Sequence, residues 1–434
     1  MSDRRVLNAG TEPVFGTVPV PGSKSVANRA LAIAALAAGE SELTGLPDGD
    51  DTVAMLSCLA NLGIAVEVAG DTAFVSGGGG VLRPTGRLDT RLAGTTSRFV
   101  TALAALADVA VVIDGDPPLR ARPMAQLHDA LVSLGARIDY GETSGHLPIS
   151  ITGPLRSGGM VSLRGDVSSQ FITALMLIGP LLDGGLIIEL TSPLVSEPYV
   201  KLSAAVMAAF GVDDVSIDPR QIAVRSGQYA GRRYHIEPDA SSASYPLAVA
   251  AARGGRVSVP GLTVASQQGD IAILDLLDRM GCVVDASDTA VAVSRTPDHP
   301  LTGIDVDMAD TSDLVPTIAV LAALASTPTT IRGVGFIRSK ESDRLGDLAG
   351  ELRKTGAGVD VTPDGLRFQP TGTLRRAELG THHDHRLAMA FAVLGSVVDG
   401  IVVHGAGTVT KSWPGFWTAY DDLLLGEAGS PSNR

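Results

Sequence analysis

The chain has 434 residues, 45% of them hydrophobic and only 4% aromatic, and its 34 basic and 47 acidic side chains give a net charge of −13. This length exceeds a single hydrophobic core, and the acidic balance argues against nucleic acid or an anionic membrane surface as a partner, so we expect two domains and no partner of either kind. Two cysteines, Cys58 and Cys282, imply no disulfide framework, and no apolar run reaches the length of a membrane span, so we expect a soluble cytoplasmic protein.

The first 80 residues predict one α/β unit. Its elements are a helix from Asn28 to Ala38, a strand at Ser41–Gly45, a helix at Asp50–Leu62, and strands at Ala65–Ala69 and Thr72–Ser76. The first helix is apolar all round, as a helix enclosed by other elements should be, whereas the second spaces its apolar residues along one face. The two later strands alternate in polarity, as in a half-exposed sheet.

This order of elements recurs six times along the chain. Junctions between a polar cluster and an apolar helical run fall at residue numbers 68 to 73 apart, at Asn28, Thr96, Ser169, Ser242, Ser312 and His385. Turns after the amphipathic runs repeat in step, at Gly63, Gly135, Gly211, Gly281 and Gly356. A fixed period indicates one supersecondary unit used repeatedly. We therefore predict an α/β fold of two domains with three units each, buried helices inside, and sheets and amphipathic helices outside.

Cations stand where helices begin, although the positive end of the helix dipole disfavours them there. Ser25 is predicted to cap the first helix, which leaves Lys24 just outside it and Arg29 one turn inside. Lys340 and Arg344 are predicted to share one face of a helix as an i,i+4 pair. Each cation alone is as well explained by a solvated surface, but the set, which also includes Arg98 and Arg386, favours phosphate or carboxylate binding.

Other polar residues near these junctions have competing explanations. Ser168, Ser169 and Gln170 offer two hydroxyls and an amide, of which helix capping explains one serine. Asp313 could simply complement a helix dipole and Glu341 could simply pair with its cationic neighbours, but in a closed cationic cleft both become candidates for proton transfer. His382, His383 and His385 lie too close together in sequence for ordinary metal geometry, so no metal is predicted.

Several of these segments together resemble the motifs of the EPSP synthase (3-phosphoshikimate 1-carboxyvinyltransferase) family of enolpyruvyltransferases. The matching segments are Gly22-Ser23-Lys24-Ser25, Asn28-Arg29-Ala30-Leu31, Ala93-Gly94-Thr95-Thr96 with Arg98, Arg122-Pro123, Ser168-Ser169-Gln170, Arg338 with Lys340-Glu341 and Asp343-Arg344, and Asp384-His385-Arg386. They occur in unbroken order from about residue 11 to residue 425, which is more specific than any single motif.

The resemblance implies a fold of two domains, each of three βαβαββ units arranged as an inside-out α/β barrel. Residues 1–22 would join residues 240–434 in one domain, residues 23–239 would form the other, and the active site would lie in the cleft between them. The implied reaction transfers the enolpyruvyl group of phosphoenolpyruvate to the 5-hydroxyl of shikimate 3-phosphate and releases phosphate, in aromatic amino acid biosynthesis. It needs no metal or organic cofactor, and we expect a monomer.

The resemblance also assigns roles to individual residues. Shikimate 3-phosphate would be bound by Lys24, Ser25, Arg29, Ser168, Ser169, Gln170, Ser196, Asp313 and Lys340. Phosphoenolpyruvate would be bound by Lys24, Gly94, Arg122, Gln170, Arg344, Arg386 and Lys411. Asp313 is the candidate base, with Lys24 or Glu341 as the candidate acid, and the sequence does not divide these roles.

Three other functions compete with this one. The nearest is an enolpyruvyltransferase acting on UDP-N-acetylglucosamine, but its reactive loop cysteine is missing from residues 114–120. A second is a related transferase acting on another cyclic alcohol in a specialised pathway. A non-catalytic scaffold of six repeats is the third, and it would not need Lys24, Arg122, Arg344, Arg386 and Lys411 together.

Overall fold

The computed structural model describes residues 3–428, and the chain divides into two compact units. The continuous unit is formed by Gly22–Glu237, and the composite unit by Met1–Pro21 with Pro238–Arg434. Within residues 3–428, no helix is both long and apolar enough to cross a membrane.

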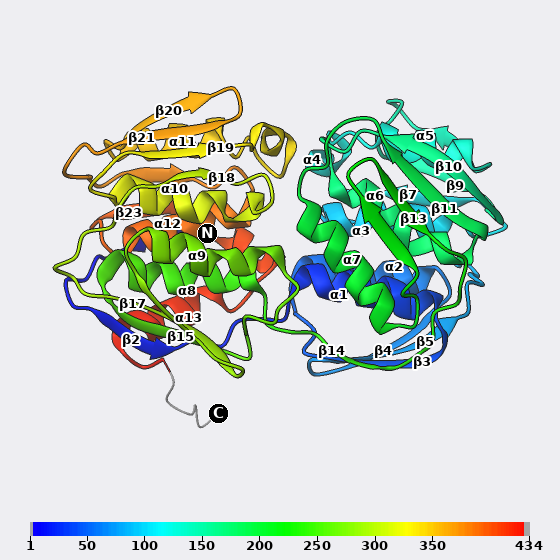
Figure 1. The fold of residues 1–434 in the computed structure, drawn as a ribbon, viewed down its shortest axis with the longest axis horizontal. Helices are drawn as coiled ribbons and strands as arrows, with labels where there is room; N and C mark the ends of the chain where they lie inside the picture. The colour runs from blue at the N-terminus through cyan, green and yellow to red at the C-terminus, as the bar shows by residue number, and fades with distance from the viewer. Residues whose placement is uncertain (1–2, 429–434) are drawn as a thin grey trace. The chain divides into compact units, whose positions relative to one another are not determined.

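Three buried helices fill the centre of the continuous unit, as Figure 1 shows for that unit alone. They are α1 (Lys24–Leu36), α3 (Gly94–Ala104) and α6 (Ser169–Ile178). Every residue of α1 from Val26 to Leu36 is buried, and many of them are alanines, so the helix backbones can approach each other closely. The helices that cover the outside are α2 (Asp50–Asn61), α4 (Pro117–Arg120), α5 (Ala125–Ser133) and α7 (Glu197–Ala209).

Three four-stranded sheets surround these helices. In order of pairing, the first contains β14 (Arg233–His235), β3 (Ala38–Thr44), β5 (Thr72–Gly78) and β4 (Ala65–Ala69). The second contains β6 (Leu88–Asp89), β7 (Val111–Asp114), β9 (Ile149–Thr152) and β8 (Arg137–Tyr140). The third contains β10 (Ser157–Leu163), β11 (Asp183–Leu190), β13 (Gln221–Val224) and β12 (Val215–Asp218).

The composite unit repeats this plan around α8 (Ala240–Arg253), α10 (Val315–Leu324) and α12 (His385–Gly395). Its outer helices are α9 (Ile273–Arg279), α11 (Gly346–Lys354) and α13 (Phe416–Leu425). Its 3₁₀ turns include η2 (Gly269–Ala272), η3 (Ser312–Leu314), η4 (Gly335–Ser339) and η5 (Ala406–Lys411), and η1 (Gly179–Leu181) belongs to the continuous unit.

Its sheets are two of four strands and one of three. In order of pairing, the first contains β16 (Val283–Ala286), β17 (Ala290–Arg295), β15 (Gly255–Pro260) and β2 (Val14–Thr17). The second contains β18 (Asp305–Asp307), β19 (Thr329–Arg332), β21 (Gly365–Gln369) and β20 (Gly358–Thr362). The three-stranded sheet contains β1 (Arg4–Leu7), β23 (Ile401–His404) and β22 (Glu378–Gly380). The predicted fold class, α/β units with apolar helices inside, is confirmed.

Each sheet contains one parallel pair of strands, and in four sheets a core helix connects that pair, as a parallel connection requires. The other two pairs are completed by distant strands: β14 pairs with β3, and β2 pairs with β15. β1 also pairs with β23 near the other end of the chain. The N-terminal strands therefore belong to the composite unit, although Lys24 and the rest of α1 do not.

Two local predictions near the candidate site are wrong. The cap of α1 is Ser23, whose hydroxyl accepts the Val26 amide, so Lys24 is the first helical residue and Ser25 lies in the first turn. Lys340 and Arg344 share no helix face, because η4 ends at Ser339 and α11 begins only at Gly346. The segment between them is irregular, which lets Arg344 turn inward, as described next.

Candidate active site

Arg344 is a buried cation in the composite unit, with 1% of its side chain exposed. Its Nη1 lies 2.8 Å from Asp313 Oδ1, its Nη2 2.8 Å from Glu341 Oε2, and its Nε 2.7 Å from Asp384 Oδ2. Burial disfavours the charged guanidinium, but the three carboxylates outweigh it and raise the pKa of Arg344. Arg344 is therefore a permanent cation, and its planar donors fix three acids at once.

Asp384 fixes the start of α12. It is fully buried and caps the helix, accepting the Arg386 amide at 2.9 Å. The same carboxylate accepts the Ser342 hydroxyl at 3.1 Å and Arg344 Nε at 2.7 Å. One buried acid thus holds both the Arg344 side chain and the first turn that carries Arg386. Sequence reasoning gave Asp384 no role, although a buried acid one residue before a helix is a recognisable capping signal.

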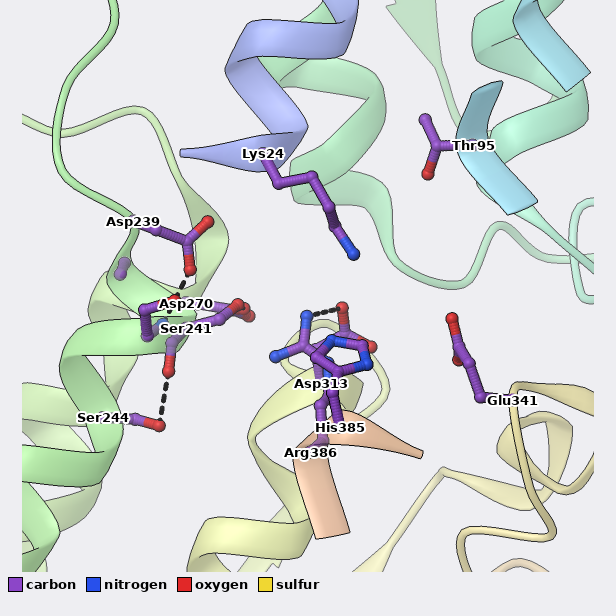
Figure 2. Close-up of polar contacts among 12 residues, drawn as sticks. Lys24, Thr95, Asp239, Ser241, Ser244, Asp270, Asp313, Glu341, His385 and Arg386 are labelled. Atoms are coloured by element: carbon purple, nitrogen blue, oxygen red, sulfur yellow. Dashed lines mark hydrogen bonds and ion pairs between the residues drawn. The ribbon is translucent and has the colours of Figure 1, made fainter. Parts of the chain in front are cut away.

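Asp313 lies in the first turn of η3, the 3₁₀ turn that leads directly into α10. Arg386 Nη2 donates to Asp313 Oδ2 at 2.6 Å, as Figure 2 shows, while Arg344 holds Oδ1. Burial opposes ionisation, but Arg386, Arg344 and Lys340 together lower the pKa of Asp313. Asp313 is therefore a carboxylate in this structure, and it can become an effective base only if its arginines find other acceptors.

Glu341 lies between two cations. Its Oε1 is 3.1 Å from Lys411 Nζ and its Oε2 is 2.8 Å from Arg344 Nη2. Lys411 ends η5 and has 8% of its side chain exposed. Lys340 follows η4, with its Nζ 5.9 Å from the centre of the Phe336 ring. The composite unit thus brings together five residues that the sequence proposed, Asp313, Glu341, Arg344, Arg386 and Lys411, with Lys340 acting on Asp313 through its charge.

Asp270 adds a second buried acid that sequence reasoning missed. It lies in η2, accepts the Ser241 hydroxyl, and is drawn beside Ser241 in Figure 2. Burial and the negative charge of Asp313 raise the pKa of Asp270 to about 6, although Arg386 opposes the shift. No motif signalled this residue, because Asp270 is 43 residues from Asp313 in sequence and the fold alone brings the two acids together.

In the continuous unit, Lys24 pairs with an acid from the neighbouring outer helix. Its Nζ lies 3.1 Å from Asp51 Oδ2, with 15% of the lysine side chain and 4% of the aspartate side chain exposed. Asp51 lies in the first turn of α2, where the helix dipole also favours its charge. Asp51 is a third acid that the sequence did not single out.

Gly94, the first residue of α3, leaves room for two guanidinium groups. A Cβ at this position would come within 2.6 Å of Arg122 Nη1 and 3.2 Å of Arg98 Nη1. Arg98 donates to the Gly94 carbonyl at 3.0 Å and to the Ser97 hydroxyl at 2.9 Å. The helix start, Arg98 and Arg122 therefore form a cationic surface that only glycine permits.

Arg29 is 3% exposed and makes three hydrogen bonds to uncharged acceptors. They are the Ser203 hydroxyl at 2.9 Å, the Ser25 carbonyl at 2.8 Å and the Tyr199 carbonyl at 3.0 Å. Burial lowers the pKa of Arg29 to about 10. Arg29 therefore connects the first turn of α1 to the first turn of α7.

The remaining residues proposed in this unit lie at the starts of α6 and α7. Ser168 caps α6 by accepting the Gln170 amide at 3.3 Å, which confirms that one serine has a capping role. Gln170 Nε2 donates to the Thr95 hydroxyl at 3.1 Å and so joins the starts of α6 and α3. Ser169 is the first residue of α6, and Ser196 precedes α7 with a φ of 56°. The hydroxyl- and amide-bearing residues thus gather at the starts of the core and outer helices.

Of the three neighbouring histidines, His382 and His385 have different partners. His382 lies 2.9 Å from Glu351, whereas His385 is buried beside Asp384, with 3.7 Å between Nδ1 and Oδ1. Among the described residues, no group of three or more His, Cys, Asp or Glu side chains could hold a metal ion.

Comparison with known proteins identifies the family to which this chain belongs. The sequence profile of EPSP synthase (3-phosphoshikimate 1-carboxyvinyltransferase) matches residues 9–420. A 3-phosphoshikimate 1-carboxyvinyltransferase of Nostoc punctiforme is 42% identical over 96% of this chain and 98% of its own length. The protein of that name from Methanoculleus marisnigri is 41% identical over 96% and 98%.

A solved structure extends the likeness to the fold. EPSP synthase from Acinetobacter baumannii superposes with a TM-score of 0.80 at 26% identity, covering 97% of this chain and 98% of that one. The profile match and the identity of the relatives both span nearly the whole chain, so the chain is an enzyme of the EPSP synthase family.

Proposed function

We propose that this chain transfers the enolpyruvyl group of phosphoenolpyruvate to the 5-hydroxyl of shikimate 3-phosphate, giving 5-enolpyruvylshikimate 3-phosphate and phosphate. The observation that carries the proposal is the shared contact of Arg344 and Arg386 with Asp313. Two arginines are thereby aimed at one carboxylate that a substrate carboxylate or phosphate can replace.

The binding roles proposed for the composite unit follow from this exchange. Arg344, Arg386 and Lys411 bind the carboxylate and phosphate of phosphoenolpyruvate, while Asp313 and Lys340 face shikimate 3-phosphate. When the two arginines turn to the substrate, Asp313 loses the cations that lower its pKa and becomes a better base. Binding of one substrate would thus prepare the group that activates the other.

The continuous unit is proposed to act on the same pair of substrates. Ser25, Arg29, Ser168, Ser169, Gln170 and Ser196 bind shikimate 3-phosphate, and Gly94, Arg122 and Gln170 bind phosphoenolpyruvate, with Lys24 serving both. Hydroxyl, amide and guanidinium donors at helix starts suit phosphate and ring hydroxyl oxygens. Bound substrates would require both units to contribute to one active site.

The chemistry has two steps. In the addition, Asp313 takes the proton of the 5-hydroxyl, and the hydroxyl oxygen bonds to C2 of phosphoenolpyruvate. An acid, Lys24 or Glu341, protonates C3 to a methyl group. In the elimination, a C3 proton returns to that acid's conjugate base, the bond from C2 to the phosphate oxygen breaks, and phosphate leaves with the proton held by Asp313. The fixed cations stabilise the charge of the tetrahedral intermediate without reorganising.

The cellular part of the proposal is a monomer that acts in the cytoplasm without nucleic acid or membrane. The net charge of −13 supports only the part that excludes nucleic acid and an anionic membrane surface. A single species of one chain's mass in sedimentation, unchanged by substrates, is the expected result.

The reaction is tested by measuring phosphate release from phosphoenolpyruvate with different acceptors. We expect release with shikimate 3-phosphate, and none with UDP-N-acetylglucosamine or with shikimate lacking its phosphate. Activity with the sugar nucleotide alone would replace this proposal with the sister reaction. Identification of the enol ether product by NMR distinguishes transfer from simple hydrolysis of phosphoenolpyruvate.

A further inference from the structure

Two successive histidines before α12 adopt a backbone conformation that side chains disfavour. The φ of His382 is 50° and that of His383 is 61°, both in the left-handed region. Residues other than glycine are strained in this region and persist there only where the surrounding structure holds them. They lie directly before Asp384, the buried cap of α12.

The contacts of His382 explain what holds this turn. Its Nε2 lies 2.9 Å from Glu351 Oε1, and its Nδ1 lies 3.8 Å from Asp347 Oδ1, both on α11. Glu351, with 7% of its side chain exposed, also accepts the Gly380 amide at 2.8 Å and Lys354 Nζ at 2.6 Å. Glu351 therefore holds the segment before α12 through two contacts, one with the Gly380 amide and one with the His382 ring.

The contact between His382 and Glu351 adds a second connection between the segments that carry Arg344 and Arg386. Arg344 precedes α11 and binds Asp384, which caps α12 and fixes the first turn carrying Arg386. At the other end of α11, Glu351 binds His382, two residues before Asp384. The segments that supply Arg344 and Arg386 are thus joined twice, once through Asp384 and once through His382.

We propose that His382 is a positioning residue that, through Glu351, holds the left-handed turn at 382–383 and so sets Asp384 against Arg344 and Arg386. The inference rests on the proposed role of these arginines in phosphoenolpyruvate binding. We assign His382 no direct contact with a substrate. Its ring, 38% exposed in the side chain, acts by fixing the path of the backbone.

His383 offers a matched control. It has the same left-handed backbone, is exposed, and makes no side-chain hydrogen bond or ion pair within residues 3–428. His382→Ala and His383→Ala therefore leave equal backbone strain, but only the first removes the bond to Glu351. His382→Gln keeps an N–H donor near the position of Nε2, and His382→Gly removes the contact together with the strain.

The test combines steady-state kinetics with hydrogen exchange of the free enzyme. For His382→Ala we expect KM for phosphoenolpyruvate to rise about tenfold, with kcat and KM for shikimate 3-phosphate within about twofold, because a small displacement weakens both arginine contacts. We expect His382→Gln to restore KM to within about threefold and His383→Ala to match wild type. In His382→Ala and His382→Gly, exchange of the Arg386 amide, which Asp384 accepts, should be faster than in His383→Ala.

Several outcomes would overturn the proposal. One is a His382→Ala enzyme whose kinetic constants equal those of His383→Ala. Another is a change in unfolding free energy alone, which would make the contact merely structural. Hydrogen exchange is measured without substrate and therefore does not depend on the proposed function. If the wild type released no phosphate but the variants showed the expected exchange pattern, the proposed function would be rejected and the positioning role would stand. Unchanged exchange in an active enzyme would reject the positioning role alone.

Discussion

Two buried arginines of the composite unit and one of the continuous unit are held in different ways. Arg344 and Arg386 are bound to carboxylates, whereas Arg29 is bound to carbonyl and hydroxyl oxygens. A cation paired with a carboxylate is held in place and its charge is neutralised. An arriving anion must therefore displace the carboxylate to bind it. Cations on neutral oxygens keep their full charge and attract anions continuously. We therefore propose that Arg29 helps the continuous unit to attract phosphate groups, and that the composite unit changes its internal pairing when phosphoenolpyruvate binds.

Breaking the composite network should have the largest effect. Arg344→Ala leaves the buried Asp384, Asp313 and Glu341 without their shared cation, which should cost about 3–5 kcal/mol in unfolding free energy and about 100-fold or more in kcat/KM. Urea unfolding and phosphate release measure the two losses. Arg338→Ala is the control, because Arg338 pairs with Asp343 at 3.1 Å in a more exposed site, and it should cost no more than about 1 kcal/mol. Equal losses in the two variants would refute a special role for the network.

Crowding the cationic surface of the continuous unit should impair binding more than folding. Gly94→Ala places a methyl group against Arg122, so KM for phosphoenolpyruvate should rise about tenfold or more as the guanidinium shifts. Kinetics at saturating shikimate 3-phosphate measure the change. Gly86→Ala is the control, because the nearest atom to its Cβ is Asn61 Oδ1 at 3.4 Å. A Gly94→Ala enzyme with unchanged KM would place phosphoenolpyruvate elsewhere.

Replacing the neutral-oxygen contacts of Arg29 should sharpen the contrast between the units. Lysine keeps the charge but cannot supply three donors in one plane to Ser203, Ser25 and Tyr199. Arg29→Lys should therefore raise KM for shikimate 3-phosphate several-fold and lower unfolding free energy by about 1–2 kcal/mol. The surface variant Arg164→Lys, whose parent pairs with Asp166, should change neither. Full activity of Arg29→Lys would mean that charge alone is needed.

The last effect concerns the pH dependence of stability and needs no change in catalysis. Burial raises the pKa of Asp270 from 3.8 to about 6, so the folded state binds its proton more tightly than the unfolded state. The resulting stabilisation is complete below pH 4 and is lost as pH rises through 6, by up to about 3 kcal/mol at about 1.4 kcal/mol per unit. The pKa of Asp313 is lowered, so its contribution stays constant over this range. Relative to wild type, Asp270→Asn should therefore be about 2–3 kcal/mol more stable at pH 7.5 than at pH 4 in urea unfolding. A difference that does not vary with pH would show that Asp270 is already ionised at pH 4.

The sequence predicted the scaffold better than its connections. The period of about 70 residues follows from helices that need apolar residues on every side, and this composition survives in each repeat, so the α/β units and inner helices were predictable. The pairing of β2 with β15 and of β14 with β3 was not, because strand partners so distant in sequence leave no periodic signal.

The candidate site was predictable only where a charged residue breaks a local preference. Lys24 and Arg386 attract notice because cations are unfavourable at helix starts. No role was predicted for Asp384 or Asp51 because acids are ordinary at helix starts, nor for Asp270 because its neighbour Asp313 belongs to another repeat. The irregular segment at 340–345 was read as a helix because its charges fit i,i+4 spacing.

Parallel assay of one variant from each unit tests most directly whether both act on the same reaction. Lys24→Gln and Arg386→Gln each remove one cation and keep a polar side chain. We predict that each lowers phosphate release from phosphoenolpyruvate with shikimate 3-phosphate by about 100-fold or more. Unfolding free energy should change less than in Arg344→Ala. If either variant retained phosphate release within about threefold of wild type, one unit would be dispensable and the account of a shared active site would be contradicted.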